Sequence, residues 1–270
     1  MHYEALVLDI DGTLYNSEKR ITAATKAAIF KAREAGKIIA IASGRPLPGV
    51  REAAGALQFA EKGGYIMAYN GGRIMNARTG EKISDIRLPA EVVPRIAALA
   101  KAHGVAVVGH APNYLVTESP DDELIQYEAR LNKMQVMTIP SLAEYTKHRL
   151  YKCLITGEAE KLAELEKIAA KEFEGELSVY RSEPYFLEIL PLGIDKAHAI
   201  DILAAHLGIS KNEVIACGDG FNDLSMIRHA GLGVAMSNAQ PVVKESADYV
   251  TDSCDEDGLV PVIERFLMVG

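Results

Sequence analysis

The alternation of short apolar runs with helix-like segments is the feature that most constrains how this chain can fold. Three early runs have the length and composition of buried strands: EALVLDI (4–10), KIIAIAS (37–43) and YIMAYN (65–70). The segments between them, 22–36 and 46–57, have the composition of helices. This alternation predicts an α/β fold built on a doubly wound, Rossmann-like parallel sheet.

The same alternation returns in the last third of the chain. The expected strands are 185–190, 213–219 and 233–236, and the expected helices are 195–208, 222–230, 240–247 and 256–267. We therefore expect the two ends of the chain to build one sheet together.

The middle of the chain has a different pattern of predicted elements. A hairpin is expected over 74–88, followed by helices at 89–103, 121–132 and 158–173 among short strand-like runs. We interpret this part as an inserted α/β domain with antiparallel strand pairs. The predicted division is a Rossmann-like core formed by 1–86 and 187–270, with an inserted cap over 87–186 that selects the substrate.

Composition limits the classes of partner. The 270 residues carry a net charge of −8, which disfavours nucleic acid and anionic membrane surfaces as partners. The start of the chain has no signal-peptide pattern, and no apolar run approaches the roughly 18 residues of a membrane span. The three cysteines show no metal-site or disulfide spacing, so a reducing, cytoplasmic location is expected. The oligomeric state is left open.

Polar residues follow the predicted strands where each of them ends. Asp9 and Asp11 follow the first, Ser43-Gly44-Arg45 the second, Asn70 the third, and 218–223 (GDGFND) a later one. Each cluster alone could simply form a turn. Ligands of open parallel sheets, however, bind outside the carboxyl ends of the strands, so together the clusters predict a binding site at this edge.

Asp9 and Asp11 are close enough in sequence to repel each other. At about 4–5 Å and an effective dielectric near 20, two ionised carboxylates cost on the order of 3–4 kcal/mol. Convergence with Asp219 and Asp223 would make a site of oxygen ligands only, which suits Mg²⁺. The repulsion is therefore a reason to expect a metal ion.

Lys196 lies in the first turn of a predicted helix, where a cation opposes the helix dipole. It could be a solvated lysine without a role. We favour the interpretation that it faces the crevice and neutralises an anion, because carboxylates nearby would keep it charged.

Four ordered motifs resemble those of the haloacid dehalogenase superfamily, and most closely its Cof-type phosphatases with a large inserted α/β cap. They are DIDGT (9–13), SGR (43–45), Lys196 within GIDKAHAI, and GDGFND (218–223). The segment 235–259 also resembles the C-terminal part of that family. The resemblance implies a phosphoric monoester hydrolase that acts on a small phosphorylated metabolite with Mg²⁺ as cofactor.

The resemblance also implies roles for individual residues. Asp9 would be the nucleophile that forms an aspartyl-phosphate, and Asp11 the general acid and base. Thr13 would support the turn that carries them. The implied phosphate-binding groups are Ser43, Lys196, Asn222 and the backbone N–H groups of Ile10 and Gly44. The implied metal ligands are Asp9, the Asp11 carbonyl and Asp219, with Asp223 acting through water or orienting Lys196.

Two positions depart from the family's pattern. Asp195 precedes Lys196 where relatives carry small or β-branched residues, so it could pair with a nearby cation. Ser237 replaces a frequent glycine. In the predicted cap, three polar loop residues could face a leaving group or simply lie at the surface: His110, Asn113 and Tyr114. Arg45 and Asn70 could likewise reach a substrate, or serve in an ion pair and a turn.

Three functions remain open on these residues. A phosphatase acting on a sugar phosphate or similar metabolite is favoured. A phosphotransferase or phosphomutase would use the same intermediate but pass the phosphoryl group to an alcohol. A phospho-receiver switch uses similar groups but has neither an inserted domain nor an acid two residues beyond the phosphorylated aspartate.

Overall fold

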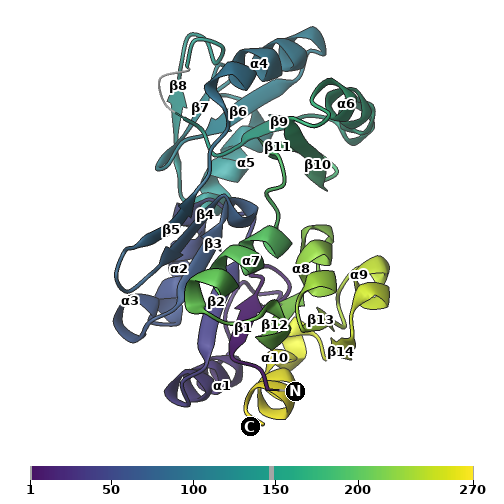
Figure 1. The fold of residues 1–270 in the computed structure, drawn as a ribbon. Helices are drawn as coiled ribbons and strands as arrows, with labels where there is room; N and C mark the ends of the chain where they lie inside the picture. Colours follow the sequence, from purple (N-terminus) through teal and green to yellow (C-terminus); the bar gives the residue numbers. More distant parts are fainter. Residues whose placement is uncertain (1, 146–148, 270) are drawn as a thin grey trace. The chain divides into compact units, whose positions relative to one another are not determined.

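The structure is a computed structural model, which describes residues 2–145 and 149–269. The chain divides into two units (Figure 1). The first unit contains residues 1–44, 50–85 and 195–270, and the second contains 45–49 and 86–194.

The first unit is built on a sheet that has eight strands within the described residues. Their spatial order is β14 (Tyr249–Thr251), β13 (Leu232–Met236), β12 (Val214–Gly218), β1 (Ala5–Leu8), β2 (Ile38–Ala42), β3 (Tyr65–Ala68), β4 (Arg73–Asn76) and β5 (Lys82–Asp85). The strands from β14 to β3 are parallel, and the hairpin β4–β5 adds antiparallel strands at the edge. The predicted doubly wound parallel sheet and the predicted hairpin are confirmed.

Helices cover both faces of this sheet (Figure 1). They are α1 (Ala23–Glu34), α2 (Leu47–Ala56, which begins in the second unit), α3 (Phe59–Lys62), α7 (Lys196–Leu207), α8 (Leu224–His229), α9 (Pro241–Ser246) and α10 (Leu259–Val262). Alternate strand residues such as Val7 and Ala216 pack with Ile200 of α7 and Met226 of α8. The intervening residues, such as Leu6, point to the other face because side chains alternate along a strand. Burial on both faces explains why these strands are continuously apolar in sequence.

One helix begins as predicted and another is shorter than predicted. Thr22 caps α1 by accepting a hydrogen bond from the Thr25 N–H, as the sequence predicted. The helix predicted over 256–267 is shorter, because α10 passes into a π-helical turn at Ile263–Leu267. Strand β14, at the sheet edge, was not predicted.

The second unit contains a sheet of six strands among the described residues. Their spatial order is β10 (Leu177–Glu183), β11 (Phe186–Pro191), β9 (Cys153–Thr156), β6 (Ala106–His110), β7 (Tyr114–Thr117) and β8 (Gln135–Thr138). All neighbouring pairs are antiparallel except β7–β8. The expected antiparallel character of this part of the chain is confirmed.

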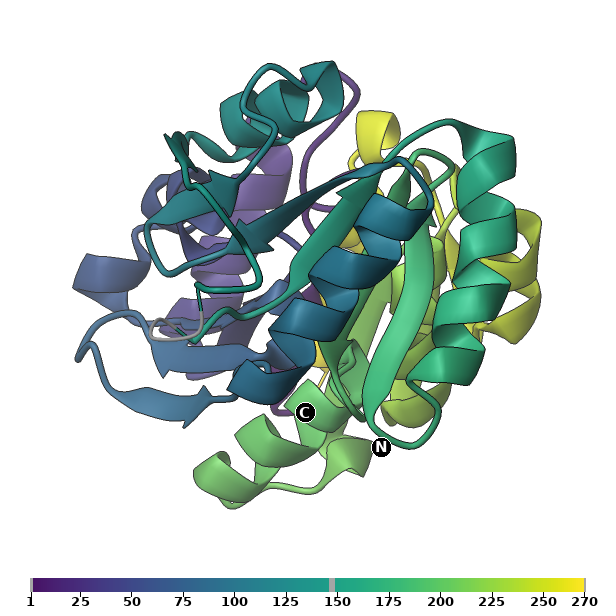
Figure 2. The same cartoon turned by 90° about the horizontal axis from the view of Figure 1, so that it is seen from above.

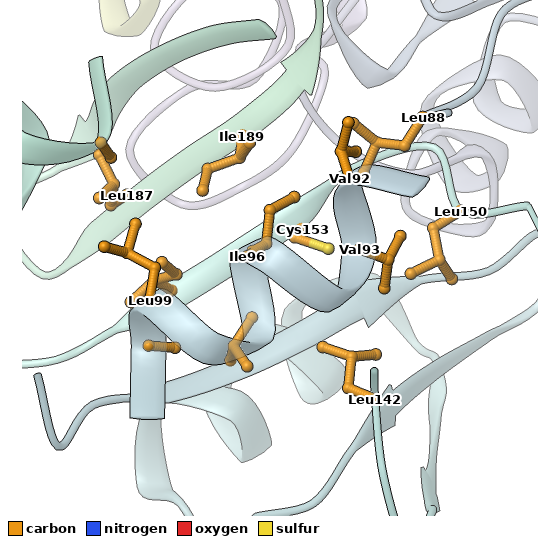
Figure 3. Close-up of a cluster of buried hydrophobic side chains, with 14 of the residues drawn as sticks. Leu88, Val92, Val93, Ile96, Leu99, Leu142, Leu150, Cys153, Leu187 and Ile189 are labelled. Atoms are coloured by element: carbon orange, nitrogen blue, oxygen red, sulfur yellow. The ribbon is translucent and has the colours of Figure 1, made fainter. Parts of the chain in front are cut away.

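Helices α4 (Val93–Ala102), α5 (Glu123–Asn132) and α6 (Ala159–Glu172) pack on this sheet (Figure 2). Figure 3 shows Ile96 and Leu99 of α4 packed with Cys153, Leu187 and Ile189 of the sheet. The alternate face packs against α5, where Leu154 and Phe186 meet Ile125. The second unit therefore has a hydrophobic core of its own.

The strand predicted at 185–190 forms, as β11, but in the other sheet. It pairs with β9 and β10, so its expected place in the first sheet is wrong. The chain returns to the first unit only at Asp195. Pairing partners of an apolar run are set by tertiary contacts, and its sequence pattern is the same in either sheet.

No helix within the described parts of the chain has both the length and the apolar character needed to cross a membrane. Cys153, Cys217 and Cys254 are free thiols.

Candidate active site

The loop after β1 holds Asp9 against β12. The Asp9 N–H donates to the Cys217 carbonyl, and the Asp9 carbonyl accepts from the Leu14 N–H. A further bond from the Tyr15 N–H to the Ile10 carbonyl closes the turn. These bonds leave Asp9 only 6% exposed at the carboxyl end of a central parallel strand.

Lys196 joins two acidic residues from different parts of the chain. Its ammonium nitrogen lies 2.5 Å from Asp9 Oδ1 and 2.5 Å from Asp223 Oδ1, and its side chain is 1% exposed. Asp195 accepts a hydrogen bond from the His198 N–H and so caps α7, with Lys196 as the first helical residue. Within the described residues, Asp195 forms this cap and not the pairing with a cation considered from the sequence.

Asp223 and Thr13 position the remaining carboxylate, Asp219. Asp223 Oδ2 accepts from the backbone N–H groups of Asp219 and Gly220, both at 2.9 Å. The Thr13 hydroxyl donates to Asp219 Oδ1 at 2.9 Å, which links the loop after β1 to the loop after β12. The motifs DIDGT and GDGFND therefore form one hydrogen-bonded unit.

Asp9, Asp219 and Asp223 form a compact acidic cluster. One oxygen from each carboxylate lies within 4.8 Å of the others. Three carboxylates and the one ammonium of Lys196 leave a formal charge of −2 (−3 + 1). Because this net charge of −2 is largely buried away from water, a further cation would stabilise the cluster.

The pKa values in this cluster reflect burial and mutual repulsion. Burial, followed by the Asp223 charge, raises the pKa of Asp9 well above its usual value despite the opposing effect of Lys196. Burial and Asp223 also raise the pKa of Asp219 to about 6. Burial would lower the pKa of Lys196, but the carboxylates of Asp223 and Asp9 outweigh it and raise that pKa above its usual value. Lys196 is thus a permanent cation that only partly offsets the carboxylates.

The cluster fits the Mg²⁺ expected from the sequence. Its donors are all carboxylate oxygens, which hard divalent cations prefer. Its residual charge of −2 would be balanced by one divalent ion.

Gly12 makes the close approach of the two loops possible. Its φ of +80° lies in the left-handed region, and a Cβ at this position would clash with the Asp219 carboxylate. The glycine of DIDGT is therefore required both by backbone conformation and by space.

The Asp11 carboxylate does not join the cluster. Three or four converging carboxylates were expected from the sequence, and the group found among the described residues has three: Asp9, Asp219 and Asp223. Asp11 instead pairs with Lys19, whose Nζ lies 2.9 Å from Asp11 Oδ1. The local repulsion between Asp9 and Asp11 is relieved because the two side chains have different cationic partners.

The residues expected to bind phosphate lie at the same edge of the first unit. Ile10 is buried one residue beyond Asp9, and Asn222 lies in the turn between Gly220 and Asp223. Ser43, which is 3% exposed, directly follows β2, and its carbonyl accepts from the Asn70 N–H. A Cβ at Gly44 would lie 3.1 Å from Asn70 Oδ1, so these two strand-end segments are closely packed.

The polar residues singled out in the second unit are placed differently from expectation. His110 is the last residue of β6 and is fully buried, 3.6 Å from Glu128 of α5, so it does not lie in an exposed loop. Tyr114 begins β7, where its hydroxyl contacts that of Tyr145. Arg45 donates to the Leu131 carbonyl at 3.4 Å.

Asn238 is a contributor to the site that the sequence did not reveal. Its amide donates to the Gly12 carbonyl at 2.9 Å, and its Oδ1 accepts from the Cys254 N–H at 3.0 Å. Asn238 thereby ties the loop after β1 to the C-terminal segment. Its sequence context suggests only a turn, so the resemblance of 235–259 was the one available signal.

The sequence matches the haloacid dehalogenase-like hydrolases over residues 6–263. The chain belongs to this family. It is therefore an enzyme, a hydrolase, and the predicted membership is confirmed.

Relatives of this family align with almost the whole chain. The 5-amino-6-(5-phospho-D-ribitylamino)uracil phosphatase YcsE of Bacillus subtilis (strain 168) is 30% identical, over 97% of this chain and 95% of that protein. A haloacid dehalogenase-like hydrolase from Bacteroides thetaiotaomicron is 43% identical with a TM-score of 0.90, covering 97% and 99% of the two chains. The HAD subclass IIB sugar phosphatase BT4131 is 29% identical with a TM-score of 0.84, covering 97% and 98%.

Proposed function

We propose that this protein is a Mg²⁺-dependent phosphatase that hydrolyses a small phosphomonoester, a sugar phosphate or similar metabolite, through an aspartyl-phosphate. The observation that carries the proposal is the buried contact of Asp9 with Lys196 beside Asp219 and Asp223. A carboxylate held by a fixed ammonium in a water-poor site is suited to attack phosphorus. The phosphatase names of YcsE and BT4131 support the same reaction class.

In the first step, an oxygen of the Asp9 carboxylate attacks the phosphorus. The new Asp9–phosphorus bond forms as the bond from phosphorus to the leaving alcohol oxygen breaks. Protonated Asp11 transfers its proton to that oxygen, so the product leaves as a neutral alcohol. Lys196, 2.5 Å from Asp9 Oδ1, offsets the charge on the transferring group.

In the second step, water replaces Asp9 on phosphorus. The Asp11 carboxylate takes a proton from the attacking water, whose oxygen bonds to phosphorus as the Asp9–phosphorus bond breaks. Inorganic phosphate is released, and both carboxyl groups return to their starting states.

The metal ion would be held by Asp9, Asp219 and the Asp11 carbonyl, with Asp223 acting through water or through Lys196. When bound, it neutralises the acidic cluster and polarises the phosphoryl group. Ser43, Asn222 and the backbone N–H groups of Ile10 and Gly44 would bind the phosphoryl oxygens.

The second unit would serve as a cap that selects the leaving group, with the first unit as the catalytic core. The separate hydrophobic cluster of the second unit supports its interpretation as an independently packed domain. The free thiols of Cys153 and Cys217, both buried, support a reducing compartment such as the cytoplasm.

A screen of phosphorylated metabolites with Mg²⁺, ranked by kcat/KM, tests the function and names the substrate class. Asp9→Asn should turn over no compound that the wild type hydrolyses. Reaction in isotopically labelled water distinguishes hydrolysis, which places solvent oxygen in the released phosphate, from transfer to a second alcohol, which does not. Near-normal activity of Asp9→Asn would refute the proposed mechanism.

A further inference from the structure

The Lys19 ammonium contacts the carboxylate to which we assign the proton transfers. Lys19 Nζ lies 2.9 Å from Asp11 Oδ1. Both side chains reach solvent, since Lys19 is 61% and Asp11 37% exposed. This contact lies outside the acidic cluster. It pairs Lys19 with Asp11, whereas in the cluster Lys196 pairs with Asp9 and Asp223.

A short, well-ordered loop presents Lys19 to Asp11. Asn16 organises the loop: its Oδ1 accepts from the Glu18 and Arg20 N–H groups, at 3.1 and 3.0 Å. Its backbone N–H donates to the Arg20 carbonyl, and its carbonyl accepts from the Lys19 N–H. This pattern turns the chain back so that residue 19 points toward residue 11.

Two further contacts anchor the first part of the same loop. Asp11 forms a backbone bridge with Tyr15, the residue before Asn16. The Ser17 N–H donates to Asp255 Oδ1 at 2.8 Å, which fixes the loop to the C-terminal segment. The backbone of Asp11 and the ammonium that contacts its side chain are therefore positioned by one structure.

Lys19 has a backbone conformation that its residue type disfavours. Its φ is +57°, in the left-handed region, where a lysine is less stable than a glycine by an amount comparable to an exposed ion pair. The gain from an exposed pair can at most offset this cost, so the pair gives no net stability as a reason for a lysine at this position. Strain at a position beside a reactive group is a reason to look for function.

We propose that Lys19 is a positioning residue that holds the Asp11 carboxylate in the orientation used for proton transfer. The inference rests on the proposed function, because it assumes that Asp11 exchanges protons with the leaving group and with water. Lys19 binds Oδ1 and so restricts rotation of the Asp11 carboxylate. This restriction favours the reaction most where a proton must be transferred in a defined direction. Within the described residues, the Lys19 ammonium binds Asp11 and makes no hydrogen bond or ion pair with Asp9, Asp219 or Asp223.

The decisive variants are Lys19→Gly and Lys19→Arg, with Lys133→Gly as a matched control. Lys133 is an exposed lysine with φ of +54° at the end of α5, so glycine relieves the same backbone strain there. Both glycine variants should unfold at the same or a higher temperature than the wild type. Only Lys19→Gly should lose activity.

Kinetics should separate positioning from a structural role. The substrates are glycerol 2-phosphate, whose alkoxide must be protonated as it leaves, and p-nitrophenyl phosphate, whose phenolate need not be. We expect Lys19→Gly to slow phosphoenzyme formation from glycerol 2-phosphate about 5- to 30-fold, with KM within twofold. Formation from p-nitrophenyl phosphate, measured by rapid quench, should change less than twofold. Lys19→Arg should retain at least a third of the wild-type rate, because it restores the cation.

The outcomes distinguish this inference from the proposed function. A Lys19→Gly protein with wild-type rates on both substrates overturns the positioning role, as does an equal loss on both or a change in KM alone. Wild-type protein that forms no phosphoenzyme from either probe or from any compound of the metabolite screen contradicts the proposed function, and the inference about Lys19 fails with it.

Discussion

Lys196 and Asp9 lie 187 positions apart in sequence, yet the lysine ammonium and the aspartate carboxylate meet at 2.5 Å in a buried contact that also includes Asp223. This contact joins the first strand of the chain to the first turn of α7. Because a buried charge without a partner is costly, the contact links the stability of the first unit to its proposed chemistry.

Replacing Lys196 should damage both properties. We expect Lys196→Met to lower kcat by at least about 100-fold, because it removes the cation beside the proposed nucleophile, Asp9. It should also lower the free energy of unfolding by about 3–5 kcal/mol at pH 7.5 without Mg²⁺, since Asp9 and Asp223 remain buried. Chemical denaturation and steady-state kinetics measure the two effects.

In the double variant Lys196→Met/Asp223→Asn, stability should partly recover while activity does not. Full stability of the single variant would contradict the ionised cluster described above.

Removing Mg²⁺ should have a pH-dependent effect on stability. The folded-state pKa of Asp219 is raised to about 6, above its ordinary value of 3.8, so the folded metal-free protein binds more protons than the unfolded chain between these values. Its stability should therefore fall as pH rises through this window, and the loss is complete above about pH 7. Mg²⁺ binds the ionised form, so the rise in Tm on adding it should be larger at pH 7.5 than at pH 5. Thermal melts with EDTA or with Mg²⁺ at each pH test this, and an equal rise at both would refute it.

Gly12→Ala should inactivate the enzyme. The added Cβ clashes with the Asp219 carboxylate, and the left-handed φ of +80° adds strain. We expect a loss of about 2 kcal/mol or more in stability and of at least tenfold in kcat. Gly80→Ala is the matched control, because its φ is +75° but no heavy atom lies within 4 Å of a Cβ there. It should cost about 1 kcal/mol and leave kcat unchanged. Equal effects of the two substitutions would show that backbone strain alone matters at Gly12.

The second unit contains a buried ion pair that offers an independent test of its core. Lys152 Nζ lies 2.8 Å from Glu188 Oε2, and both side chains are almost fully buried. Lys152→Met should lower the free energy of unfolding by about 3–5 kcal/mol, whereas Lys152→Met/Glu188→Leu should be close to the wild type. The exposed pair Lys167–Glu164 serves as a control, and Lys167→Met should change stability by less than about 0.5 kcal/mol. A stable Lys152→Met single variant would show that Glu188 is not left charged and buried.

Much of the first unit was predictable because its local signals agree. Continuous apolar runs give strands buried on both faces, as in β1 and β2, and the cap residue Thr22 marks the start of α1. Parallel strands bring their carboxyl ends to one edge, so the grouping of Asp9 with Asp219 follows from topology.

The direction of individual side chains was not predictable in the same way. Asp11 was expected beside Asp9, but it turns to Lys19 through a loop whose shape depends on Asn16 and on Asp255 near the other end of the chain. Likewise, the run at 185–190 has the composition of a buried strand that could belong to either sheet. Its pairing with β9 and β10 assigns it to the sheet of the second unit.

Residue order alone was enough to predict the strand and helix alternation and the acidic character of the site, because these depend on neighbours within a few positions. The partners of each carboxylate, the sheet to which β11 belongs and the clash that keeps residue 12 a glycine depend on groups that are distant in sequence. Those were decided by three-dimensional packing, since a side chain takes its orientation from whichever charges and surfaces the folded chain brings to it.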